Sequence, residues 1–191
     1  MTNASTLLRA ARKSRRLTQA QLAERARVDQ GGISRSENGR DADFSTISRL
    51  LAGSGYRLYS APSTRDDAAT VAAEIRLRLS TGDKDRALRA LLQLNDNLVA
   101  ERSLVRGILT IAEPESTRVA VWDAAIAGLV AWRLNEEGLP LPDWTRAPSR
   151  FLRTPTTLGV DPADPTPPLD EVPSEFAERG VLVWRDTFAS I

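Results

Sequence analysis

The chain has 191 residues, of which 41% are apolar, and its 26 Lys and Arg against 25 Asp and Glu give a formal net charge of +1. It contains no cysteine and no histidine, which excludes disulfides, the usual zinc sites and a Ser-His-Asp triad. The length allows one domain or two small ones. The first residues lack the pattern of a signal peptide, and the longest apolar run, residues 119–132, is short and broken by Asp123. We therefore expect a cytoplasmic protein that makes no use of a membrane.

The charge is distributed unevenly along the chain. Residues 1–60 hold 11 Lys and Arg against 5 Asp and Glu, whereas residues 61–191 hold 15 against 20. A basic first module attracts phosphate and an acidic remainder does not. Such charge runs are usually plain solvated helix faces. The first predicted helix and its exit carry a cluster of five basic residues, Arg9, Arg12, Lys13, Arg15 and Arg16.

Four short helices are predicted in the first module, near 5–15, 19–26, 30–37 and 45–52. Thr18 and Asp29 are N-cap residues for the second and third, and Asp43 or Ser45 caps the fourth. The apolar residues expected to form a small core are Leu7 or Leu8, Ala11, Leu17, Leu22, Val28, Ile33, Phe44, Ile47, Leu50 and Leu51.

The second and third predicted helices have the pattern of a helix-turn-helix. Ile33 faces inward, while Gln30, Ser34 and Arg35 lie on or beside the opposite face. A helix held in this way can enter the major groove with its N-terminal residues at base edges. Duplex DNA is therefore the first ligand to consider, and we expect the protein to be associated with the nucleoid when it is bound to DNA. Because the basic cluster of the first helix adjoins this motif, it favours phosphate binding over a plain solvated face. The alternative is a helix-turn-helix that serves only as a packing or dimer module.

Several residues stand at the spacing that the XRE family, the lambda-repressor-like helix-turn-helix proteins, uses: Thr18-Gln19, Leu22-Ala23, Ala26, Val28, Ile33-Ser34 and Glu37. Residues 5–60 resemble that family. The resemblance implies that Gln19 contacts a phosphate and braces Gln30, which reaches a base edge. It also implies that Ser34 and Arg35 contact bases or backbone and that Asn38 contacts a phosphate. With the neighbouring basic residues added, the predicted DNA-binding residues are Gln19, Gln30, Gly31, Ser34, Arg35, Asn38, Arg12, Lys13 and Arg16.

Four positions depart from the family pattern. Arg27 stands where glycine is favoured, and a positive φ there costs about 1–2 kcal/mol. Gly31 and Gly32 open the recognition helix at roughly 1 kcal/mol each relative to alanine. Ser36 stands where an apolar residue is common.

A break between two modules is predicted at Pro62-Ser63-Thr64, after a short extended segment at residues 56–60. The expected domains are a DNA-binding domain at 1–61 and a dimerisation or partner-binding domain at 62–191. Apolar residues at helical spacing predict three helices from Ala68 to Leu79, Leu88 to Val99 and Leu104 to Leu109. A fourth, capped by Ser116 or Thr117, runs to about Asn135, and its buried side is Trp122, Ala125, Ile126, Leu129 and Val130.

The last third of the chain is irregular. Proline is dense from Thr154 to Pro173, Phe176 starts a last turn of helix, and residues 181–184 have the pattern of a buried strand or core-docking tail. The predicted fold class is mainly α. It comprises an N-terminal lambda-repressor-like helix-turn-helix bundle and a mostly helical C-terminal domain with a Pro-rich loop at 154–173 and a short terminal strand.

Four stretches of the second module, residues 122–125, 139–144, 150–152 and 176–181, look like the C-terminal region of XRE regulators encoded beside nucleotidyltransferase-type toxins. That resemblance implies an antitoxin that represses its own operon. Aromatic residues are favoured at interface hot spots. The segment 161–178 contains six acids and no base, which suits a basic groove on a toxin but also a solvated loop. The partner-binding candidates are Trp144, Phe151, Asp170 and Glu171.

No constellation of residues points to catalysis. The adjacent acids Asp66 and Asp67 would point to opposite faces of a strand and cannot share one metal. The pairs Glu113/Glu115 and Glu136/Glu137 stand at helix ends or beside a proline, where exposed acids are ordinary. We expect no enzyme, no metal and no cofactor.

Two functions remain open, and a regulated enzyme, the third class, has no supporting site. The first is a DNA-binding repressor that is also an antitoxin. The second is a stand-alone dimeric repressor whose C-terminal domain binds a small effector. In either case we expect a homodimer, formed through the second module, on an inverted-repeat operator in double-stranded DNA, with recognition helices about 34 Å apart or a multiple of that.

Overall fold

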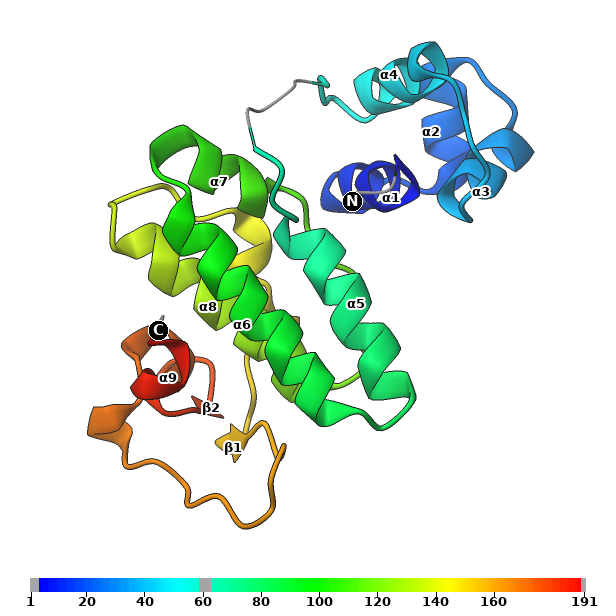
Figure 1. The fold of residues 1–191 in the computed structure, drawn as a ribbon. Coiled ribbons are helices and arrows are strands. Elements are labelled where there is room, and N and C mark those ends of the chain that lie inside the picture. Colours follow the sequence, from blue (N-terminus) through cyan, green and yellow to red (C-terminus); the bar gives the residue numbers. More distant parts are fainter. Residues whose placement is uncertain (1–3, 59–62, 190–191) are drawn as a thin grey trace.

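The computed structural model describes residues 4–58 and 63–189. Two groups of helices make up most of this part of the chain, and a long irregular segment lies at the end farthest from the N-terminal group (Figure 1). The predicted mainly α fold class is confirmed. The predicted boundary between residues 61 and 62 lies outside the described residues, as does the end of the predicted extended segment 56–60.

The N-terminal group contains four short helices: α1 (Ala4–Ser14), α2 (Gln19–Ala26), α3 (Gln30–Glu37) and α4 (Phe44–Gly53). Their start and end residues differ from the predicted ones by at most one. Thr18 caps α2 through a capping box, since its Oγ1 accepts a hydrogen bond from Gln21 N at 3.1 Å while Gln21 Oε1 accepts one from Thr18 N at 2.9 Å. Asp29 Oδ2 caps α3 by accepting from Gly32 N at 2.9 Å.

The core of this group is small and lies between all four helices. Leu8, Leu22 and Ile33 are fully buried in it, and Val28 packs against its edge. The prediction that Phe44 joins this core is wrong, because its side chain is 73% exposed. Phe44 is the first residue of α4, and helical side chains tilt toward the N-terminus, so its ring points beyond the end of the helix.

The second group is built from α5 (Ala68–Ser80), α6 (Lys84–Ala100), α7 (Ser103–Ile111) and α8 (Ala120–Asn135). Helix α8 is the centre of this group, and every residue from 122 to 131 is buried. A helix that is apolar all round needs partners on every side. The predicted buried residues of α8 are confirmed, but neighbours surround the whole helix instead of covering one face.

The start of α8 differs from the prediction. Neither Ser116 nor Thr117 caps the helix, which begins after Val119 with no side-chain cap. Both bind the carboxylate of Asp123 instead: Ser116 Oγ donates to Oδ2 at 2.6 Å, and Thr117 N donates to Oδ1 at 2.7 Å. Arg118, with a φ of 68°, turns the chain between this loop and the helix. The loop is therefore held by Asp123, a residue of α8 itself.

The irregular C-terminal part packs back onto α8. Strands β1 (Thr156–Thr157) and β2 (Val181–Leu182) pair in parallel, with Thr156 opposite Val181. The buried Val181 confirms the predicted strand, and α9 (Ser174–Ala177) confirms the predicted last turn of helix. Single 3-10 turns complete this part: η1 (Asp143–Arg146), η2 (Pro148–Arg150), η3 (Leu169–Glu171) and η4 (Arg185–Phe188).

One close approach fixes α9 against α8. A Cβ added at Gly128 would lie 3.1 Å from Phe176 Cδ1, which is a tight contact, so glycine lets the aromatic ring approach the helix backbone without being displaced. The Phe176 ring stacks on Phe188 at a centroid distance of 5.1 Å and meets the edge of Trp132 at 6.2 Å. No helix in the described ranges is both long and apolar enough to cross a membrane.

Candidate nucleic-acid interface

The turn between α2 and α3 sets the direction of the recognition helix. Arg27 ends α2 in the left-handed region, with φ 53° and ψ 52°. The positive φ considered for this position, where the family favours glycine, is therefore present. Its backbone N–H bonds back to the last turn of α2, and Asp29 then starts α3. Two helices joined by so short a turn are held at a fixed angle.

The outward face of α3 is open to solvent. Ile33 is fully buried, whereas Gln30 and Arg35 are exposed and Ser34 is half-buried. This is the division between core and groove-facing residues that the sequence predicts. Buried Ser36 contributes to the inner face in place of the usual apolar residue.

Arg35 lies back over the first turn of its own helix. Its Nη2 is 3.6 Å from Asp29 Oδ2, and both side chains are largely exposed. A Cβ on Gly31 would lie 3.1 Å from Arg35 Nη1 and 2.9 Å from Asp29 Oδ2, so Gly31 leaves the room that this contact needs. Exposed ion pairs contribute little to stability. A base edge or a phosphate can therefore replace Asp29 as the partner of Arg35 at small cost.

Glu37 joins the three helices behind this face. Its carboxylate is almost fully buried and accepts hydrogen bonds from Arg12 Nε at 2.6 Å, Arg12 Nη2 at 2.9 Å and Gln19 Nε2 at 2.8 Å. Arg9 donates to the Glu37 carbonyl oxygen. Burial by itself raises the pKa of Glu37, but the hydrogen bonds from Arg12 and Gln19 and the nearby cations outweigh it and lower the pKa below its usual value. Glu37 is therefore ionised and ties α1, α2 and α3 together.

This network changes the interpretation of two predicted DNA contacts. The side chain of Arg12 is only 12% exposed, and its third nitrogen, Nη1, donates to Leu17 O at 2.7 Å. All three nitrogens of the guanidinium are bound within the protein, which corrects the prediction of Arg12 as a phosphate contact. Gln19 donates to Glu37 and not to Gln30, so the predicted bracing of Gln30 is also absent from this structure.

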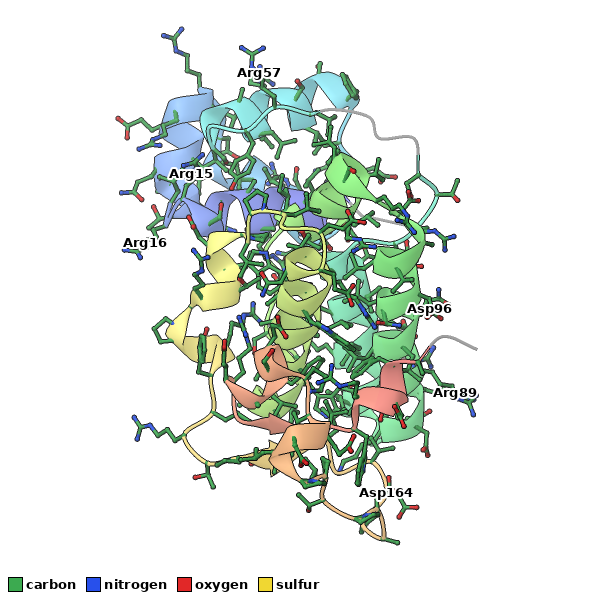
Figure 2. All side chains as sticks on the ribbon, turned by 90° about the vertical axis from the view of Figure 1, so that its left-hand side faces the viewer. Arg15, Arg16, Arg57, Arg89, Asp96 and Asp164 are labelled. Atoms are coloured by element: carbon green, nitrogen blue, oxygen red, sulfur yellow. The ribbon has the colours of Figure 1, made fainter. Side chains whose placement is uncertain are left out.

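Three other predicted contacts remain accessible. Lys13 is 54% exposed, and Arg16 and Asn38 are exposed at the end of α1 and at the C-cap of α3. Figure 2 shows Arg15, Arg16 and Arg57 projecting from the end of the molecule that holds the helix-turn-helix. A basic end next to the recognition helix suits a polyanion.

A second buried carboxylate connects the two groups of helices. Glu115 Oε1 is 2.5 Å from Arg9 Nη1 and 3.7 Å from Lys13 Nζ, while Oε2 is 2.6 Å from Arg76 Nη1. Burial raises the pKa of Glu115, but the hydrogen bonds from Arg9 and Arg76 outweigh it and lower the pKa. The sequence suggested an ordinary exposed acid, and the structure corrects this, because the side chain is only 15% exposed.

The predicted partner-binding residues divide into two kinds. Trp144 is buried, and its Nε1 donates to Thr110 O at 2.9 Å, which corrects its prediction as a partner anchor: it is a core residue. Phe151 remains 40% exposed, with the Arg179 guanidinium 5.1 Å from its ring centroid. Asp170 and Glu171 are exposed on η3.

Residues 8–56 match the family model described as Helix-turn-helix, from α1 to the residues after α4. The protein carries a DNA-binding helix-turn-helix domain of the XRE type. No curated protein and no solved structure matches the chain. This match supports a DNA-binding transcriptional regulator. Within the part of the chain that the structure describes, no three acids lie together in a way that would hold a metal ion.

Proposed function

We propose that the protein is a sequence-specific repressor that binds an inverted-repeat operator as a homodimer. The observation that carries this proposal is the unobstructed outer face of α3, where Gln30 and Arg35 are exposed while Ile33 fixes the helix in the core. One such helix reads only a few base pairs, so two copies are needed for a specific site.

Selection of bound fragments from sheared genomic DNA, using the full chain, tests this function. We expect the recovered sequences to share two inverted half-sites whose centres are one helical turn, about 34 Å, or a multiple of it apart. A reporter gene behind that site should then be silenced by the protein. Recovery of fragments without a common sequence, or activation of the reporter, would contradict the proposal.

Exposed apolar residues on α7 support dimerisation through the second module. Leu104 and Ile111 are 74% and 58% exposed and lie two turns apart, on one face of the helix. A charge placed on this face by Leu104→Glu should convert the dimer to a monomer in sedimentation velocity. The control Leu169→Glu, at an equally exposed leucine on η3, should leave the dimer intact. A wild-type protein that sediments as a monomer would remove this part of the proposal.

The position of the acidic segment supports the further role of antitoxin. Asp164 lies at the end of the molecule opposite Arg57 and the helix-turn-helix (Figure 2). Contacts at and just before the segment hold it on the second module: Lys84 Nζ donates to Gly159 O at 2.7 Å, Trp184 Nε1 donates to Pro165 O at 3.2 Å, and Asn135 Nδ2 donates to Glu175 Oε1 at 2.9 Å. Acids presented at this end can meet a basic protein while the other end binds DNA. By the resemblance of the second module, we propose that the basic partner is a nucleotidyltransferase-type toxin.

Affinity purification of the full chain from its host tests the antitoxin role. We expect one nucleotidyltransferase-like protein in stoichiometric amount. The double variant Asp170→Asn/Glu171→Gln should lose it, whereas Asp41→Asn/Glu24→Gln, which removes the same charge from exposed positions of the helix-turn-helix, should retain it. Recovery of the chain alone would favour the stand-alone repressor with a small effector.

A further inference from the structure

A groove separates the helix-turn-helix from the second module. It encloses about 860 Å³. One wall includes Gln19, at the start of α2, and Asn38, at the end of α3, which are the two positions proposed to contact phosphate. The opposite wall includes Arg76, from α5, and Arg118, from the loop before α8. The groove therefore continues the proposed DNA surface onto the second module.

Positive charge predominates in this groove. Its lining contains two carboxylates, Glu37 and Glu115, against five cationic side chains: Arg9, Arg12, Lys13, Arg76 and Arg118. Both carboxylates are already shared among several of these cations. A cleft with an excess of one sign of charge concentrates counter-ions, here anions.

Among the described residues that line the groove, Arg118 is the cation whose side chain has no partner. Its side chain is exposed, and its guanidinium has no hydrogen bond or ion pair with any residue in the described ranges. The backbone around it is firmly held: its N–H donates to Ser116 Oγ at 3.0 Å, the next side chain back, Thr117, is buried, and its φ is 68°. A non-glycine residue in the left-handed region is uncommon, and such residues are enriched at functional positions.

We propose that this groove binds the phosphate backbone of the DNA beside the recognition helix, and that Arg118 is a phosphate contact outside the helix-turn-helix. The inference rests on the proposed function. A DNA strand that passes Gln19 and Asn38 also passes the mouth of the groove, since both residues form part of its wall. The second module thereby adds to DNA affinity without reading sequence, because phosphate contacts position a protein and carry no sequence information.

The salt dependence of DNA binding tests the inference. The full chain and its variants are titrated by fluorescence anisotropy into a random-sequence duplex of about 30 base pairs at roughly 50 to 200 mM salt. We expect Arg118→Gln to reduce the slope of log K against log[salt] by about 0.9 for each groove engaged. Arg118→Lys should restore the slope. The matched control is Arg89→Gln, which removes an exposed arginine of α6 far from the helix-turn-helix (Figure 2) and should leave the wild-type slope.

Each outcome separates the inference from the proposed function. Equal slopes for Arg118→Gln, Arg89→Gln and the wild type overturn the inference while DNA binding stands. A wild type that binds no duplex overturns both the inference and the proposed function.

Calorimetry with inorganic phosphate at fixed ionic strength distinguishes a free phosphate ligand from the DNA backbone. Phosphate binding that Arg118→Gln abolishes, with an unchanged DNA slope, assigns the groove to a small ligand and overturns the inference. Thermal unfolding of each variant verifies its fold.

Discussion

Glu37 and Arg35 lie two residues apart on α3, and their side chains point to opposite sides of the helix. Glu37 faces inward and satisfies Arg12 and Gln19, so it orients the helix, while Arg35 faces outward and has only the exposed Asp29 as partner. We therefore expect the first residue to contribute to stability and the second to recognition. Their substitutions should therefore separate folding from DNA specificity.

Glu37→Gln should lower the free energy of unfolding by about 3 kcal/mol, because it leaves the buried guanidinium of Arg12 without its counter-charge. Chemical denaturation measures the loss, and Glu24→Gln, at an exposed position of α2, should cost almost nothing. Equal stability of the two variants would contradict the role of Glu37.

The lowered pKa of Glu37 also predicts a pH dependence. Since its pKa is lower in the folded protein than in the unfolded chain, the stability it contributes is fully present above the unfolded value of about 4.3. That stability is lost as the pH falls through the folded pKa. Denaturation between about pH 6 and pH 3 should show a smaller loss in Glu37→Gln than in the wild type.

Arg35→Ala should relax specificity at one base position by about 1–3 kcal/mol, since a guanidinium can bind a guanine through two hydrogen bonds. Arg16→Ala should instead weaken binding to the operator and to a random duplex by the same factor, and it should reduce the slope of log K against log[salt] by about 1. Arg12→Ala should also weaken both duplexes equally, through loss of support for α3. Binding isotherms on the two duplexes measure these effects. Equal losses for Arg35→Ala on both would remove its role in base recognition.

At the scale of elements, the turn between α2 and α3 combines a good cap with a strained residue. Asp29 satisfies the start of α3, but Arg27 holds a left-handed conformation that glycine adopts without strain. The angle between the two helices is thus kept at some cost in stability. The advantage of glycine is offset in part by the greater freedom it gives the unfolded chain.

Arg27→Gly should raise the free energy of unfolding by up to about 1 kcal/mol. The matched control is Arg25→Gly, two residues earlier inside α2, which should lower it by about the same amount because glycine disfavours a helix interior. Thermal or chemical denaturation compares the two. A loss of stability in both variants would contradict the strain assigned to Arg27.

At the scale of the whole molecule, Glu115 joins the helix-turn-helix to the second module. Its carboxylate receives Arg9 and Lys13 from α1 and Arg76 from α5. Without its charge these three cations would face one another. One carboxylate therefore forms the centre of a charged contact between the two modules.

Glu115→Gln should loosen the contact between the two modules and increase the radius of gyration in small-angle X-ray scattering. Glu113→Gln is the control, because Glu113 pairs only with Arg150, at 3.8 Å, within the second module. The lowered pKa of Glu115 implies that the wild type keeps the closed arrangement above about pH 4.3 and loosens as the pH falls through the folded pKa. Unchanged scattering for Glu115→Gln would show that apolar contacts alone hold the modules.

The helices, their caps in the first module and the two faces of α3 could be predicted from the sequence alone. Thr18, Asp29 and Ile33 act within one or two turns of chain, where capping and helical periodicity decide the outcome. The helical turn at Phe176 and the burial of Val181 followed from the same local reasoning.

Which polar residues are free to bind a ligand could be seen only in the folded protein. Arg12 is held by Glu37 25 residues away, Trp144 by Thr110 34 residues away, and Glu115 by Arg9 106 residues away. The same long-range packing placed Arg118 across a groove from α2 and α3. Local patterns carry no information about such partners, because a charged or aromatic side chain has the same propensity whether it finds a counterpart in the fold or remains in solvent.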